Sequence, residues 1–161
     1  MRGRASDRLR AFAILALGAM TWTGAALAAP VEVLRATDGR SECLGALADG
    51  EGFRYEYIQS IYLAPVTEEL ERRGDRIRML RARSTDIRAV EYFRWDGPIR
   101  HDPGGYVQDA PFYETDRLVI RISPQYHQRI DGAGWSCDLP ERFGDRIVAI
   151  EPAVRPALAL R

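Results

Sequence analysis

The sequence contains no lysine and no asparagine, so all 23 basic residues are arginine. The 23 acidic residues bring the formal net charge to zero, whereas dedicated nucleic-acid-binding proteins carry a basic excess. A chain of 161 residues that is 46% hydrophobic and 29% charged has the length and composition of one globular domain. Because every cation is a planar guanidinium, the chain is well suited to two-point pairing with carboxylates.

Residues and motifs that carry chemistry are scarce. The only histidines are His101 and His127, and neither has a second ligand at a spacing typical of metal sites. No phosphate-binding glycine loop, paired C-x-x-C or G-x-S-x-G motif is present. We therefore expect no metal, no cofactor and no catalytic residue. A small periplasmic hydrolase that uses Ser60 or a loop histidine is the alternative.

Only one long apolar run occurs, and it lies at the N-terminus. Residues 1–10 carry four arginines, residues 11–28 carry no charge, and the run ends in Ala26-Leu27-Ala28. This pattern is typical of a cleaved secretory signal peptide over residues 1–28, with a transmembrane anchor as the alternative. The mature protein is then periplasmic and not inserted in the membrane. With 19 arginines against 22 acidic residues, it has little affinity for nucleic acid or anionic lipid.

Two cysteines, Cys43 and Cys137, follow the signal sequence. An even number of cysteines in an oxidising compartment predicts a disulfide, which here closes a long loop. Two free buried thiols are the alternative.

The rest of the chain alternates short apolar runs with glycine-containing turns. This spacing predicts an all-β fold, a single antiparallel β-sandwich or barrel-like domain of about seven to eight short strands over residues 29–151. Residues 152–161 are expected to form a C-terminal tail. The expected strands cover residues 31–35, 41–48, 53–63, a hairpin over 66–83, and then 87–95, 117–123, 134–137 and 146–151.

Two of these segments carry sharper expectations. The aromatic strand at 53–63 places Phe53, Tyr55, Tyr57 and Ile61 on its buried face, together with Gln59. The hairpin turns at 73–75 and has a bulge near residues 79–80, where the alternation of apolar residues slips.

Between the strands, residues 96–111 contain three prolines and three glycines and are expected to form a long irregular loop. Acidic residues also gather at Glu68, Glu69 and Glu71, beside several arginines. A solvated, salt-bridged sheet face explains them, and an arginine site for an anionic ligand is the alternative.

Residues 57–61 read Tyr-Ile-Gln-Ser-Ile and are followed by Pro65-Val66 and two glutamates. This segment resembles a small bacterial extracytoplasmic family, domain of unknown function family 1850, whose pattern there is Tyr-Ile-His-Ser-Val, then Pro-Val and Glu. The resemblance implies an accessory protein associated with TRAP-type solute transporters of the TAXI class, with transporter components or a small solute as partners. Gln59 departs from the pattern, because an amide cannot titrate as histidine does.

These observations favour an exported, non-catalytic accessory or binding protein of the bacterial envelope. A recognition site is expected where residues 59–69 meet the loop at 96–111, because polar groups there lie beneath an aromatic-rimmed loop. Hydrogen bonds that merely join the hairpin are the alternative. The candidate binding residues are Gln59, Ser60, Pro65, Glu69, His101 and Tyr106.

Export makes a prediction of its own. Cleavage after Ala28 gives a mature chain that begins at Ala29, and mass spectrometry of the periplasmic protein should find that N-terminus. Recovery of a chain that still begins at Met1 would contradict a cleaved signal peptide.

Overall fold

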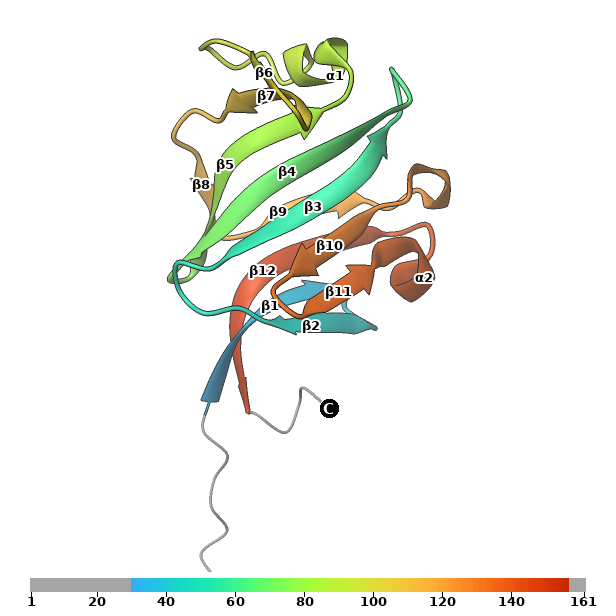
Figure 1. Cartoon of the computed structure of the whole chain (residues 1–161). Helices are drawn as coiled ribbons and strands as arrows, with labels where there is room; N and C mark the ends of the chain where they lie inside the picture. The colour runs from blue at the N-terminus through green and yellow to red at the C-terminus, as the bar shows by residue number, and fades with distance from the viewer. Residues whose placement is uncertain (1–29, 157–161) are drawn as a thin grey trace, which may run out of the picture.

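The computed structural model describes residues 30–156, which form two antiparallel sheets packed face to face (Figure 1). The predicted signal peptide lies outside the described residues. The smaller sheet has the order β2-β1-β12-β9. Its strands are β1 (Pro30–Thr37), β2 (Glu42–Ala46), β9 (Leu118–Arg121) and β12 (Ile147–Pro156).

The larger sheet has the order β11-β10-β3-β4-β5-β7-β6, and the short strand β8 also pairs with β5. Its strands are β3 (Gly52–Gln59), β4 (Ala64–Arg73), β5 (Arg76–Ser84), β6 (Arg100–Asp102), β7 (Gly105–Asp109), β8 (Glu114–Thr115), β10 (Arg129–Gly132) and β11 (Trp135–Asp138). The short helices are α1 (Ile87–Glu91), α2 (Leu139–Phe143) and a 3₁₀ turn at Pro124–Tyr126.

The predicted all-β sandwich is therefore confirmed, although it has twelve strands within residues 30–156 and not seven or eight. The hairpin at 66–83 is also confirmed, with its turn at Gly74, whose φ of 61° suits glycine. Glu69 pairs with Arg81 and Leu70 with Met79, so Leu80 is the extra residue of a β-bulge.

Two predicted segments are wrong. Residues 87–95 do not form a strand, because Asp86 caps a helix by accepting a hydrogen bond from the backbone N–H of Arg88 at 3.0 Å. Residues 96–111 are not an irregular loop, because β6 and β7 pair within them and Gly105, with φ of 112°, makes the tight turn.

The strand boundaries also differ at two places. β3 ends at Gln59, so Ile61 lies in the following turn and is 57% exposed, not buried as predicted. At the other end of the chain, β12 runs through the expected tail to Pro156. The prolines are tolerated because β9 pairs only with Ile147–Ile150, which leaves the rest of β12 as an edge strand.

Buried apolar side chains form two separate clusters on the inner face of the larger sheet. The α1 cluster, Ala64, Val66 and Ala89, lies beneath helix α1. The main cluster lies between the two sheets and comprises Leu34, Ala36, Leu47, Phe53, Tyr55, Leu70, Ile77, Ile122, Ile130, Cys137, Leu139, Phe143, Val148 and Ile150. Figure 1 shows the same division, with α1 at one end of the larger sheet and β1, β2 and β12 towards the other.

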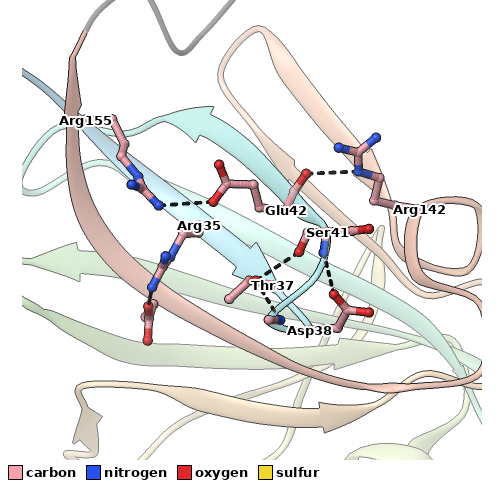
Figure 2. A network of polar contacts seen from close by, with 9 residues as sticks. Arg35, Thr37, Asp38, Ser41, Glu42, Arg142 and Arg155 are labelled. Carbon is pink, nitrogen blue, oxygen red and sulfur yellow. Dashed lines mark hydrogen bonds and ion pairs between the residues drawn. The ribbon is translucent and has the colours of Figure 1, made fainter.

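The smaller sheet is fixed by arginine–carboxylate contacts, several of which Figure 2 shows. Asp38 accepts a hydrogen bond from the backbone N–H of Ser41 at 2.7 Å (Figure 2). It also accepts one from Arg146 at 2.8 Å, which ties the β1–β2 turn to the residue that precedes β12. Arg155 of β12 pairs with Glu42 of β2 at 3.1 Å. The arginines of this region therefore stabilise the smaller sheet.

The predicted disulfide is present and joins one sheet to the other. Cys43 of β2 and Cys137 of β11 have Cα atoms 6.4 Å apart, within disulfide reach. The ring of Trp135 packs against Gly45 beside it, so closely that a Cβ on Gly45 would lie 2.1 Å from the ring. Trp135 also donates its indole N–H to the carbonyl oxygen of Ala46 at 2.7 Å.

Removing the disulfide should destabilise the sandwich. In the unfolded chain, the disulfide closes a loop between cysteines that are 94 residues apart, and the double variant Cys43→Ser, Cys137→Ser removes this constraint. Its free energy of unfolding should fall by about 4 kcal/mol, measured by urea denaturation at neutral pH. An unchanged urea midpoint would show that the disulfide is not what holds this edge together.

Candidate functional site

A single acidic side chain lies between the two apolar clusters. On the inner face of β4, Val66 belongs to the α1 cluster and Leu70 to the main cluster. Glu68 lies between them on the same face, opposite Tyr55 of β3 and Ala82 of β5. The smaller sheet covers one end of this face and α1 covers the other, so Glu68 lies at the boundary of the two covers.

The carboxylate of Glu68 has no arginine within 4.0 Å among the described residues, and its only side-chain hydrogen bond there is from the Tyr57 hydroxyl at 2.9 Å. Its neighbour Glu69 points to the outer face and pairs with Arg81 at 3.1 Å. Burial raises the pKa of Glu68 to about 7, and the hydrogen bond from Tyr57 offsets only part of that effect. Burial likewise raises the pKa of Tyr57, and the nearby charge of Glu68 adds to it.

Glu68 opens into a cavity of about 360 Å³, which we name the Glu68 pocket. Its remaining lining is mainly aromatic and apolar. Besides Glu68, the pocket is lined by Met79, Phe93, Trp95, Pro111 and Tyr113.

The aromatic wall of this pocket is held in place by the chain that follows α1. Arg94 has a φ of 53°, and the rings of its neighbours Phe93 and Trp95 lie 4.6 Å apart, centroid to centroid. The buried side chain of Gln108 donates to the carbonyl oxygens of Trp95 at 2.9 Å and Gly97 at 3.0 Å. A non-glycine residue at positive φ costs on the order of 1–3 kcal/mol, which is typical of segments constrained by function.

A second cavity of about 400 Å³, the tyrosine pocket, lies on the other side of Tyr57 and shares Phe93 with the Glu68 pocket. The two pockets are adjacent, because Phe93 lines both and Tyr57 of one donates its hydroxyl to Glu68 of the other, and together we call them the groove. The tyrosine pocket is lined by Tyr55, Tyr57, Gln59, Tyr92, Tyr126 and Gln128, among others.

Two equally buried glutamines in the tyrosine pocket differ in their hydrogen bonding. Gln128 accepts from the backbone N–H of Ser123 at 2.6 Å and donates to the Tyr55 hydroxyl at 2.7 Å. Gln59 is also only 6% exposed, but its amide oxygen is buried and has no partner among the described residues. A buried polar atom without a partner costs about 1–3 kcal/mol of stability.

The structure brings two of the sequence-predicted site residues to this groove. Gln59 and Ser60 both line the tyrosine pocket. Residues 96–111 also border the groove, through Ala110 and Pro111 of the Glu68 pocket.

The other predicted site residues lie elsewhere. Pro65 is exposed at the start of β4, and Glu69 is on the outer face beside Arg81. The rings of His101 and Tyr106 pack against each other in the β6–β7 hairpin, tilted by 60° with centroids 4.8 Å apart. Neither His101 nor Tyr106 lines the Glu68 pocket or the pocket that contains Gln59 and Ser60.

Sequence reasoning missed Glu68, although the sequence carries a signal for it. In β4, Val66 and Leu70 share one face by the two-residue period of a strand, and Glu68 falls between them on that face. The solvated, salt-bridged face was the correct interpretation for Glu69 and Glu71, which pair with arginines, but not for Glu68.

The comparisons with known proteins add no further identification. The chain matches no protein-family model, and neither a curated protein nor a solved structure is significantly similar to it. In residues 30–156, no group of three or more histidine, cysteine or acidic side chains could hold a metal ion. No helix in that range is long and apolar enough to cross a membrane.

The raised pKa of Glu68 makes stability depend on pH. The folded protein keeps the proton up to a pH of about 7, whereas the unfolded chain releases it near its ordinary value of 4.5. Stability from this group is therefore present in acid and is lost as the pH rises through about 7. The glutamine in Glu68→Gln cannot ionise. The free energy of unfolding of this variant, relative to that of wild type, should therefore rise by about 1–3 kcal/mol between a pH of about 4.5 and 8.

Urea denaturation across that pH range measures this difference. Glu69→Gln is the matched control, because its exposed pairing with Arg81 contributes little to stability. If the difference in free energy of unfolding between Glu68→Gln and wild type does not change with pH, Glu68 ionises as freely as an exposed glutamate.

Proposed function

We propose that this protein is an exported, non-catalytic recognition protein of the bacterial envelope, which binds a small solute in the groove beneath α1. The observation that carries the proposal is the pair of unsatisfied groups on either side of Tyr57. Glu68 lacks a cation, and the buried amide oxygen of Gln59 lacks a donor. A few such polar groups in an aromatic-lined cavity are typical of small-molecule sites.

Export to the periplasm is supported by two independent features. Residues 1–28 have the charge and hydropathy pattern of a signal peptide. The Cys43–Cys137 disulfide favours an oxidising compartment, since disulfides are rare in proteins that stay in a reducing cytosol.

A role beside a TRAP-type uptake system of the TAXI class rests on the resemblance of residues 53–69 to domain of unknown function family 1850. A solute-binding groove in a periplasmic protein suits such a role. Gln59, the position at which this chain departs from the family's histidine, lines the tyrosine pocket. The departure favours hydrogen bonding over proton transfer at that position.

The geometry favours binding over hydrolysis. Ser60 is exposed and makes no side-chain hydrogen bond to a histidine or carboxylate among the described residues. His101 packs against Tyr106, and His127 ends the 3₁₀ turn in a left-handed conformation. A serine hydrolase requires a base within hydrogen-bond reach of its nucleophile.

The two tryptophans of the described chain provide the test. Trp95 lines the Glu68 pocket, whereas Trp135 is bonded to Ala46 at the edge of the sandwich. In ¹⁵N NMR spectra of the purified protein, a solute from a library of organic cations, carboxylates, sugars and amino acids should shift the indole signal of Trp95. The signal of Trp135 should stay in place.

A pocket-filling variant provides the control. Ala110→Phe places a ring in the Glu68 pocket and should abolish the shift, whereas Ala48→Phe, at an exposed turn, should not. Deletion of the gene should also lower transport of the same solute, and Ala110→Phe should fail to restore it. The proposal is wrong if no member of the library shifts Trp95, or if a library compound is hydrolysed by wild type.

A further inference from the structure

We propose that the Glu68 pocket selects an organic cation, a small molecule bearing an alkylated ammonium group. The inference rests on the proposed recognition function and adds the charge and chemical class of the ligand. The evidence for it is the charge of Glu68 and the side chains that line the pocket.

The charge of ionised Glu68 has no partner among the described arginines. The chain has 23 arginines, yet none lies within 4.0 Å of Glu68 among the described residues. Along the β4–β5 pairing, Arg81 and Arg83 flank the partner of Glu68, and they are held by Glu69 and Asp102 respectively. Arg121, which lines the tyrosine pocket, is held by Asp145 at 2.7 Å. No cation of the described chain therefore stabilises the ionised form of Glu68, and a cationic ligand would supply that charge.

Three aromatic side chains line the pocket together with Glu68. Phe93, Trp95 and Tyr113 surround the space in front of Glu68, and aromatic faces attract cations through the negative potential of the ring. Elsewhere the protein uses this interaction with its own arginines, as where Arg88 lies 5.0 Å from the centre of the Tyr62 ring. Within the described residues, no arginine lies over the three rings of the Glu68 pocket in this way. The arginines of the described chain therefore do not compete with a ligand for these three rings.

The lining of the pocket suits an alkylated ammonium better than a guanidinium. A guanidinium is bound best by two carboxylate oxygens side by side. In Glu68, Oε1 already accepts the hydrogen bond from Tyr57. The rest of the lining is apolar and leaves most guanidinium N–H groups without an acceptor. An alkylated ammonium has few N–H groups or none, and its methyl groups pack well against the rings of Phe93 and Trp95.

Binding should also depend on pH, because the cation requires the ionised form of Glu68. The titratable groups that face Glu68 are Tyr55 and Tyr57 from β3 and Tyr113 from the chain before β8, and none of them is cationic. The facing residues of β5 and of the segment after α1 are uncharged. Because the pKa of Glu68 is about 7, the affinity should fall about tenfold from a pH of about 8 to about 6.

The test compares two probes that differ only in charge, choline and its neutral carbon isostere 3,3-dimethyl-1-butanol. Titrations of purified protein, followed by the indole signal of Trp95, should give an affinity for choline at least about tenfold higher at a pH of about 8. Glu68→Gln should remove this preference, so that the two probes bind with equal affinity. Glu69→Gln, one residue away on the outer face, should keep the preference.

Each other result is also decisive. Equal affinities for the two probes would overturn the cation inference and leave the recognition function intact, as would binding of only neutral or anionic members of the solute library. Failure of choline to shift Trp95 at millimolar concentration would overturn the inference as well, and the library then decides the recognition function separately. Circular dichroism of Glu68→Gln confirms that any loss of preference occurs in a folded protein.

Discussion

The structure depends on a difference in extent between the two sheets, because the inner face of the larger sheet is longer than the part that the smaller sheet covers. Strands β3, β4 and β5 present a long inner face, and the smaller sheet packs against only part of it, through the main cluster. The rest is covered by α1 and the aromatic segment that follows it, through the α1 cluster. Two covers of different kinds meet at a boundary, and the groove with Glu68 lies at that boundary.

Polar groups elsewhere in the interior show how unusual the groove is. Arg72 is almost fully buried, yet it donates to the carbonyl oxygens of Leu47 and Gly74, each at 2.8 Å. Gln128 is likewise fully paired. Glu68 has no arginine beside it, and the amide oxygens of Gln59 and Gln108 are buried without a partner among the described residues. Gln59 and Glu68 line the groove, and Gln108 holds its aromatic wall through the carbonyl oxygen of Trp95.

The sequence predicted features that depend on local patterns. The alternation of apolar residues and the glycine turns predicted a sandwich, and the slip in alternation after Met79 located the bulge at Leu80. Two cysteines behind an expected signal sequence predicted the disulfide. The helix α1 was missed because the aromatic residues that follow Asp86 favoured a strand, while the capping hydrogen bond of Asp86 decided the local conformation.

The site was harder to predict because it depends on contacts between distant segments. Glu68 was grouped with its acidic neighbours, although the two-residue period of β4 separates it from Glu69. Its isolation depends on the register of β3, β4 and β5 and on the position of Trp95, which Gln108 fixes from another strand. No local pattern contains that information.

The most direct test of this account is a titration of the Glu68 carboxyl carbon, followed by ¹³C NMR and assigned with Glu68→Gln. The account predicts an apparent pKa of about 7 in the ligand-free protein. A bound cation should lower it, because the positive charge favours the carboxylate. A pKa of about 4.3, the value of a freely solvated glutamate, would show that the boundary between the two covers does not isolate Glu68.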